Sequence, residues 1–346
     1  MRFGVIGSGS WATALTKILT DNSNPVNWWI RNEASLRHIQ TRRHNPQYLP
    51  SVYFDTSLLA LNQKVEDVVA ASDCLVVAVP SAYLTGTLEG LDRKALQGKK
   101  IVSAIKGILP EQNLLLNDYL SREFAVSSAD YFTVMGPCHA EEVAAEKLSY
   151  LTFSGEDETS TREIASYFTT EYLNTVINHD VNGVQYAAIL KNIYALGAGI
   201  AHGLEYGDNF LSVLIANCAD EMAGFLRKAG IRNIEVGVHS GEEDPVSHRK
   251  SANYAASVYL GDLLVTCYSL YSRNRTFGNM IGKGYSVKAA QLELNMVAEG
   301  YNASKCIYLI NKEIGAEMPI AGMIYRILWE NVKAGVGFKQ IEPYLV

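Results

Sequence analysis

Short apolar runs alternate with helical patterns through the first half of the chain. Runs rich in β-branched residues occur at 2–6, 26–30, 74–79, 100–104 and 133–135, and two more at 150–153 and 175–178. Their apolar character is unbroken, which is typical of parallel strands that are covered on both faces. The first half is therefore predicted to form a doubly wound α/β domain with a parallel sheet.

The pattern changes after residue 180, where strand-like runs give way to helical spacing. Leu214, Cys218 and Met222 lie on one stripe of a helix that Gly230 is predicted to end. A chain of 346 residues is long enough for two domains. We therefore predict an α/β domain at 1–180 and an all-α domain at 181–346.

Net charge, apolar runs and cysteine spacing limit the partners and the compartment that we expect for this chain. The 30 basic and 36 acidic residues give a net charge of −6, which argues against a nucleic-acid-binding surface, so a bound anion needs local basic groups. No apolar run reaches the roughly 18 residues of a membrane span, and the first residues do not resemble a signal peptide. Five scattered cysteines without a CxxC pair predict neither a metal site nor a disulfide framework. We expect a cytoplasmic protein.

The first strand leads directly into the sequence GSGSWA at residues 7–12. Gly7 would allow a tight turn, Gly9 would let the backbone approach a pyrophosphate, and Ala12 would allow close helix packing. Ser10 and Trp11 stand in the same turn, where a helix N-terminus would supply amides to the phosphates. A tight turn without a ligand is the alternative. The position after the first strand favours a dinucleotide-binding domain at 1–180.

An NAD-specific domain usually offers an acidic side chain to the ribose about 20 residues after the last glycine. This chain has Arg31 there. A guanidinium could pair with a 2′-phosphate, which favours NADP over NAD as the cofactor. In the alternative, Arg31 is a surface charge and Glu33 binds the ribose hydroxyls.

Several further motifs follow in a fixed order and spacing. They are NPQYLP (45–50), AVPS (78–81), SAIKGI (103–108), MGPCHAEEVA (135–144), LKNIYALGAGI (190–200), SRNR (272–275) and VAEGY (297–301). Together with GSGSWATAL, they resemble the bacterial-type NAD(P)-dependent glycerol-3-phosphate dehydrogenase family over nearly the whole chain. The resemblance implies a Rossmann-type N-terminal domain, a helical substrate and catalytic domain, and reversible reduction of dihydroxyacetone phosphate to sn-glycerol 3-phosphate for phospholipid synthesis.

The resemblance implies that Lys191 donates the proton in carbonyl reduction. An ordinary lysine, with a pKa near 10, is a reluctant donor at neutral pH. Burial and a second ammonium would both lower its pKa, and Lys106, which follows a strand at the carboxyl edge of the sheet, is the candidate neighbour. For either lysine alone, a solvent-exposed side chain is the alternative.

The SRNR segment offers a hydroxyl, an amide and two guanidiniums, a set that suits a phosphate. The resemblance implies that Ser272, Arg273 and Asn274 contact the substrate, that Arg273 also contacts the cofactor, and that Arg275 is a surface charge. It further implies that three residues of the helical domain hold the substrate hydroxyl and orient the proton donor: Asn192, Asp262 and Thr266. Asp262 could instead be a helix N-cap.

Two further segments match the family. Gly136, Cys138 and Ala140 match a loop that lies against substrate and nicotinamide, and Val297 and Glu299 match a second cofactor-binding segment. Cys138 stands where the family commonly has serine, and we expect a packing role for its neighbour, His139.

The chain also departs from the family. The glycine-rich approach to Asp262 is shortened to YLGD, and the polar stretch before it, 232–253, is longer than expected. The small residues at 197–201 would permit close helix packing and favour a homodimer. Two other functions are alternatives: a β-hydroxyacid or ketopantoate-type dehydrogenase, which would not need the phosphate cluster, and a non-catalytic NADPH sensor, which would not need the lysines.

Overall fold

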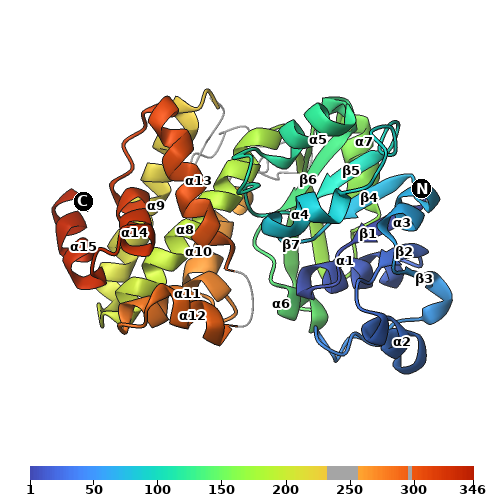
Figure 1. Cartoon of the computed structure of the whole chain (residues 1–346), viewed down its shortest axis with the longest axis horizontal. Helices are drawn as coiled ribbons and strands as arrows, with labels where there is room; N and C mark the ends of the chain where they lie inside the picture. The colour runs from blue at the N-terminus through green and yellow to red at the C-terminus, as the bar shows by residue number, and fades with distance from the viewer. Residues whose placement is uncertain (232–255, 295–297) are drawn as a thin grey trace, which may run out of the picture. The chain divides into compact units, whose positions relative to one another are not determined.

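The computed structural model describes residues 1–231, 256–294 and 298–346. The chain forms two compact units, Met1–Ile105 with Leu114–Val181, and Lys106–Asn113 with Asn182–Val346 (Figure 1). The short segment Lys106–Asn113 therefore belongs to the second unit, although it follows a strand of the first. The assignment of cofactor binding to 1–180 and of substrate binding to 181–346 remains a prediction.

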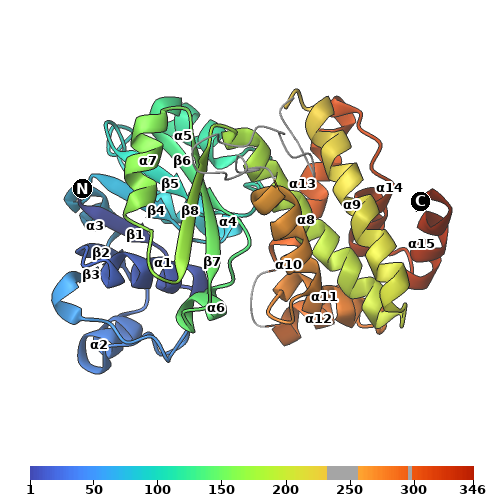
Figure 2. The same ribbon diagram turned by 180° about the vertical axis from the view of Figure 1, so that it is seen from behind.

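The first unit is an eight-stranded sheet in the order β3-β2-β1-β4-β5-β6-β7-β8. Its strands are β1 Phe3–Ile6, β2 Val26–Trp29, β3 Leu59–Asn62, β4 Cys74–Val77, β5 Lys100–Ser103, β6 Tyr131–Met135, β7 Ser149–Gly155 and β8 Leu173–Asn178. Its helices are α1 Ser10–Asp21, α2 Glu33–Arg42, α3 Val65–Ala71, α4 Ser81–Leu88, α5 Leu116–Phe124, α6 Ala140–Ala144 and α7 Glu158–Ser166. Helices flank both faces: α4 lies in front of the sheet in Figure 1 and α7 in Figure 2.

The predicted α/β fold is confirmed, with two corrections. The sheet is mostly rather than wholly parallel, because β7 pairs antiparallel with β6, Phe132 facing Gly155. In addition, β3 was not predicted from the sequence. That edge strand reads Leu-Ala-Leu-Asn, is half-exposed and contains no β-branched residue, so it lacks the signal by which the other strands were recognised.

The order of the strands places the sheet's switch point between β1 and β4. The chain runs outward from β1 through β2 and β3 on one side and from β4 through β5 and β6 on the other. β1 and β4 pair in parallel up to Ile6 and Val77. The loops that follow these strands, which begin at Gly7 and Ala78, therefore leave the sheet side by side. Ligands of doubly wound sheets bind at the carboxyl ends of strands at such a point.

Among the described residues, the regular elements of the second unit are all helices. Its helices are α8 Val181–Gly203, α9 Asp208–Lys228, α10 Asp262–Tyr268, α11 Arg273–Gly282, α12 Val287–Leu294, α13 Glu299–Ile314, α14 Pro319–Trp329 and α15 Ala334–Ile341, with a π-helical turn at Ala256–Gly261. The prediction of an all-α second part is confirmed. Gly230 follows α9 with a φ of +85°, as expected of a residue that ends a helix.

The central helix α8 is buried almost throughout and packs closely against α11. A Cβ added at Gly199 would lie 2.1 Å from the carbonyl oxygen of Arg275, and one at Gly278 would lie 2.1 Å from that of Leu196. Glycine is therefore required where the two backbones meet. The small residues of α8 pack within their own unit, and the expected homodimer stays a prediction.

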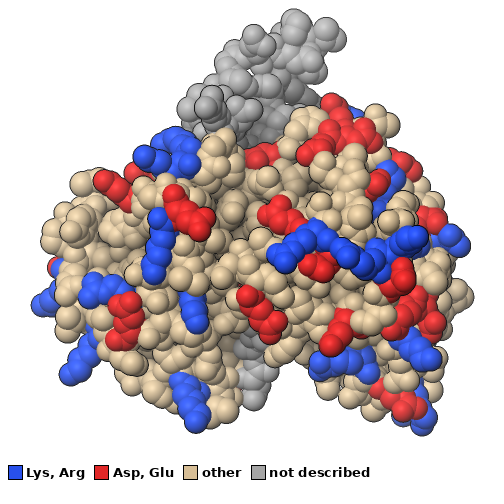
Figure 3. Space-filling model, turned by 45° about the horizontal axis from the view of Figure 1, so that its top comes forward, with Lys and Arg blue, Asp and Glu red and all other residues tan. Residues whose placement is uncertain are grey.

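Two surface properties bear on partners. Among the residues that the structure describes, no helix has both the length and the apolar character of a membrane span. Acidic and basic side chains are interspersed on the face shown in Figure 3 rather than gathered into one basic patch.

Candidate active site

The glycine-rich turn after β1 has the geometry of a phosphate-binding turn. Gly7 has a φ of +136°, and a Cβ there would lie 2.5 Å from the carbonyl oxygen of Ala78 and 3.3 Å from Cβ of Ala12. Gly9 is the N-cap of α1, and a Cβ there would meet nothing within 4 Å. Ser10 and Trp11 form the first turn of α1, which contains no acidic residue. The open approach and the helix N-terminus fit a dinucleotide pyrophosphate.

Two residues that the sequence analysis did not assign hold this turn. The indole Nε1 of Trp28 donates to the carbonyl oxygen of Gly7 at 2.7 Å. The buried Asn45 donates through Nδ2 to the carbonyl oxygen of Ser8 at 3.1 Å and to Thr13 Oγ1 at 3.0 Å. The available signal for Asn45 was its place in NPQYLP, a motif that had no assigned role.

Arg31 follows β2 and is exposed. Because β2 pairs in parallel with β1, Arg31 leaves the same sheet edge as the glycine-rich turn. Among the described residues no ion pair involves Arg31, whereas Glu33, the alternative ribose ligand, pairs with Arg37 one turn along α2. An exposed guanidinium at this edge suits a 2′-phosphate, and the contact stays a prediction.

The segment after β6 lies at the same sheet edge. Gly136 has a φ of +126°, and a Cβ there would lie 2.9 Å from the carbonyl oxygen of Tyr150. Cys138 is buried, His139 is the N-cap residue of α6 without a side-chain cap, and Ala140 begins that helix. Of the other predicted cofactor-binding segment, Glu299 begins α13, while Val297 lies outside the described residues, as does most of the polar stretch at 232–253.

The helical unit brings three predicted catalytic residues together. Lys191 on α8 and Asp262 at the start of α10 are 3% and 1% exposed, and Lys191 Nζ contacts Asp262 Oδ1 directly. Lys106 Nζ lies 3.9 Å from the other carboxylate oxygen, Oδ2. Two ammonium groups thus share one buried carboxylate.

This environment makes Lys191 an unusual lysine. Burial lowers its pKa to about 7, the nearby Lys106 ammonium acts in the same direction, and the Asp262 carboxylate opposes both. The two causes expected from the sequence are therefore both present. An amine with a pKa close to neutral can donate and accept a proton under ordinary conditions.

Asp262 is not the N-cap of its helix, since Gly261 occupies that position. Its carboxylate faces the lysines instead. Thr266 Oγ1 donates to the backbone carbonyl of Asp262 at 2.6 Å and lies 3.5 Å from Oδ1. Asp262 Oδ2 is buried and accepts no hydrogen bond within the described part of the chain, so an acceptor remains for a hydroxyl group.

The SRNR segment forms the N-terminus of α11. Ser272 is its N-cap and accepts from the backbone N–H of Arg275 at 3.3 Å. Arg273 is exposed, and no ion pair involves it among the described residues. Asn274 is buried and hydrogen-bonded to Asn192. Arg275 was expected at the surface but is half-buried, and its Nε is shielded from solvent without a hydrogen-bond partner in the described residues.

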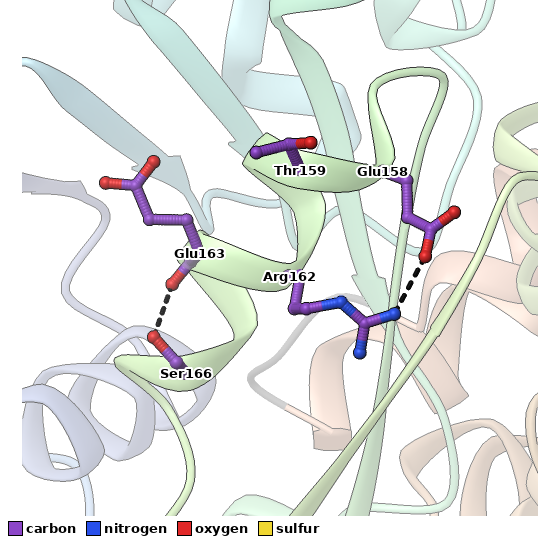
Figure 4. Close-up of a pocket in the computed structure, with 5 residues that line it drawn as sticks. All are labelled: Glu158, Thr159, Arg162, Glu163 and Ser166. Atoms are coloured by element: carbon purple, nitrogen blue, oxygen red, sulfur yellow. Dashed lines mark hydrogen bonds and ion pairs between the residues drawn. The ribbon is translucent and has the colours of Figure 1, made fainter.

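A surface pocket along α7 contains none of these residues. It is lined by Glu158, Thr159, Arg162, Glu163 and Ser166 (Figure 4). Arg162 pairs with Glu158 at 2.7 Å, and Ser166 Oγ donates to the carbonyl oxygen of Glu163 at 2.6 Å. All five lining residues are exposed, whereas Lys191 and Asp262 are buried, so the lysine cluster is the better candidate.

Comparison with known proteins agrees with this geometry. Residues 2–161 match the sequence model for the N-terminus of NAD-dependent glycerol-3-phosphate dehydrogenase, and residues 180–337 match the model for its C-terminus. The chain belongs to the NAD-dependent glycerol-3-phosphate dehydrogenase family. Its members are oxidoreductases. The glycine-rich turn and Lys106 lie in the matched N-terminal region, and Lys191 and Asp262 lie in the matched C-terminal region.

Similar members of the family include two bacterial proteins named glycerol-3-phosphate dehydrogenase [NAD(P)+]. The one from Bacillus cytotoxicus is 33% identical over 96% of this chain and 93% of its own length. The one from Salinibacter ruber is 34% identical over 94% and 91%. The cofactor of these relatives is accordingly NAD or NADP.

Solved structures of the family share the fold. The Coxiella burnetii glycerol-3-phosphate dehydrogenase has a TM-score of 0.84 at 22% identity, covering 98% of both chains. A D-mandelate dehydrogenase with NADH has a TM-score of 0.57 at 13% identity, covering 96% of this chain and 98% of its own. Both likenesses concern the fold alone.

Proposed function

We propose that this chain catalyses the reversible NAD(P)H-dependent reduction of dihydroxyacetone phosphate to sn-glycerol 3-phosphate. The observation that carries the proposal is the buried pair of Lys191 and Asp262, with Lys106 beside it, in a chain of this family. The product would supply phospholipid synthesis in the cytoplasm. Cofactor binding would fall to the first unit and substrate binding to the second.

The bound dinucleotide supplies or accepts the hydride of the reaction. Lys191 donates a proton to the carbonyl oxygen as the alcohol forms and takes it back in the reverse direction. Its lowered pKa suits both directions. Lys106 keeps that pKa low, and Asp262 holds the Lys191 ammonium while its free oxygen Oδ2 accepts a substrate hydroxyl. The buried position excludes water from the proton transfer.

The substrate phosphate would bind at the N-terminus of α11. Its first turn offers the backbone N–H groups of Arg273 and Asn274, and the dipole of this ten-residue helix favours an anion. The exposed Arg273 guanidinium supplies the countercharge and a bidentate donor. Gly7, Gly9, Ser10 and Trp11 would hold the dinucleotide, with Gly136, Cys138 and Ala140 beside the reacting groups. We assign NADP as the preferred cofactor because Arg31 lacks an acidic partner in the described residues.

Comparing substrates tests this function directly. The oxidation of NADPH by the purified protein is followed by absorbance with dihydroxyacetone phosphate, unphosphorylated dihydroxyacetone and ketopantoate. Only the phosphorylated ketone should support fast turnover. Faster turnover with ketopantoate would contradict the phosphate assignment. Turnover that is no faster with any ketone than without one would instead favour a cofactor-binding protein without catalysis.

A further inference from the structure

We propose that Asn274 is a positioning residue. Its buried side chain connects the first turn of α13 to Asn192, which in turn binds the backbone of Lys106. The inference rests on the proposed function, because it concerns the same reaction. The inference gives different roles to two neighbours on α11: Arg273 recognises substrate, and the Asn274 carboxamide holds the catalytic residues in place.

Three hydrogen bonds form one continuous relay within the helical unit. Asn192 Nδ2 donates to the carbonyl oxygen of Lys106 at 2.9 Å. Asn274 Nδ2 donates to Asn192 Oδ1 at 2.9 Å, and Asn274 Oδ1 accepts from the backbone N–H of Gly300 at 3.0 Å. Asn192 and Asn274 are 5% and 8% exposed. Breaking a bond in such a buried chain leaves polar groups unsatisfied.

The two ends of the relay fix its direction. The carbonyl of Lys106 can only accept, and the N–H of Gly300 can only donate. Each carboxamide must therefore turn its nitrogen toward Lys106 and its oxygen toward Gly300, which removes the usual ambiguity in asparagine orientation. An aspartate at position 274 would place an acceptor against Asn192 Oδ1. Rotating the Asn192 amide would only move that conflict to the carbonyl of Lys106.

A second contact shows how closely the relay draws its segments together. A Cβ added at Gly300 would lie 2.4 Å from the backbone carbonyl oxygen of Asn192. The start of α13 thus approaches α8 directly beside Lys191. Glu299, which the family resemblance assigns to the cofactor, immediately precedes Gly300 in this turn. The relay therefore joins a proposed cofactor-binding turn to both catalytic lysines.

The relay also bears on the protonation of Lys191. Among the described residues, the ionisable groups that act on that amine include Asp262 and Cys267 from α10, and Lys106 from the segment after β5. Among these groups, the Lys106 ammonium lowers the pKa of Lys191. If the backbone of Lys106 is released, its ammonium can move away from Lys191, and the pKa of Lys191 should rise.

The main test uses Asn274→Ala, with Asn279→Ala as the matched control. Asn279 lies on the same helix, and its side-chain oxygen has no hydrogen-bond partner in the described residues. Asn274→Ala should lower kcat about 10- to 100-fold by misplacing catalytic groups, with a change of less than about threefold in KM for dihydroxyacetone phosphate. Activity with unphosphorylated dihydroxyacetone should fall by the same factor. The alkaline limb of the reductive pH profile should move to higher pH, which a loss of stability alone would not cause.

Contrary outcomes are equally distinct. A loss confined to KM for the phosphorylated substrate would make the Asn274 side chain a phosphate ligand, and an unmoved pH profile would disconnect it from Lys106. Asn274→Asp, of nearly the same shape, carries the same measurements if the alanine variant does not fold. Hydrogen exchange in the wild type adds a test that needs no variant, since a rapidly exchanging Gly300 amide would overturn the relay. If wild type does not reduce dihydroxyacetone phosphate, the proposed function fails instead.

Discussion

Lys191 and Glu221 are two buried ionisable residues of the helical unit whose surroundings differ in one informative way. Burial lowers the pKa of Lys191 and raises that of Glu221, and both reach about 7. Glu221 on α9 has a full set of donors: the N–H groups of Ile320 and Ala321 at 2.8 and 2.9 Å and the hydroxyl of Tyr194 at 3.2 Å. Glu221 therefore caps α14, which has no side-chain cap of its own.

Lys191 has a smaller set of partners. The Lys191 ammonium has three N–H donors, and among the described residues Asp262 is the acceptor that contacts it. The neighbouring ammonium of Lys106 repels the Lys191 ammonium. The second oxygen of Asp262 also accepts no hydrogen bond from the residues that the structure describes. A buried ionisable group whose hydrogen-bonding atoms are all matched can serve the fold, whereas one with hydrogen-bonding atoms left over is available to bind and react with a substrate. The comparison thus separates a structural residue from a proposed catalytic one.

The most direct test of the comparison between Lys191 and Glu221 is to remove the Lys191 side chain. Lys191→Ala should lower kcat by a factor of roughly 100 or more, because a general acid contributes about 10²- to 10⁴-fold. Binding of NADPH, measured by fluorescence titration, should be nearly unchanged. A folded variant that turns over like wild type would show that another group donates the proton.

Removing Glu221 should have the opposite signature. Glu221→Ala leaves three buried donors without acceptors and should lower the free energy of unfolding by about 3 kcal/mol or more, measured by urea denaturation. The kcat of the folded fraction should change less than about threefold. A large loss of kcat at unchanged stability would place Glu221 among the catalytic residues and remove the contrast.

The pH dependence of the free energy of unfolding tests the raised pKa of Glu221. Because the fold raises its pKa from 4.5 to about 7, the native state holds a proton that the unfolded state has lost. Its contribution to stability is therefore fully present below about pH 4.5 and is lost as the pH rises through about 7. The difference in unfolding free energy between wild type and Glu221→Gln should shrink over this window, and a constant difference would contradict the assigned shift.

Arg273 extends the comparison to an exposed cation without an ion pair in the described residues. Arg273→Ala should raise KM for dihydroxyacetone phosphate by roughly 10- to 150-fold, since charge-assisted bonds to an anion contribute about 1.5–3 kcal/mol. Arg273→Lys should recover little of that loss because the bidentate geometry is absent. Equal losses with phosphorylated and unphosphorylated dihydroxyacetone would show that Arg273 does not contact the phosphate.

Periodicity and motif order predicted most of the fold, because the strands that were found are apolar and β-branched. They could not reveal the polar edge strand β3 or the antiparallel direction of β7, which depend on pairing between distant segments. The candidate site was likewise predicted only in part. Lys191, Lys106 and Asp262 were named from motifs, and the structure brings them together. The support of the glycine-rich turn by Trp28 and Asn45 was missed, since such contacts join residues far apart in the sequence.

The smallest expected effect concerns the exposed Arg31, whose proposed role is to contact the 2′-phosphate of the cofactor. If Arg31 contacts the 2′-phosphate, Arg31→Ala should weaken NADPH binding about 10- to 100-fold and leave NADH binding nearly unchanged. Exposure to solvent and salt favours the lower end of that range, and the effect should shrink as ionic strength rises. Arg37→Ala is a matched control, because Arg37 is a nearby exposed arginine already paired with Glu33. If wild type binds NADH as tightly as NADPH, Arg31 is a surface charge, and Glu33 becomes the residue to test at the ribose.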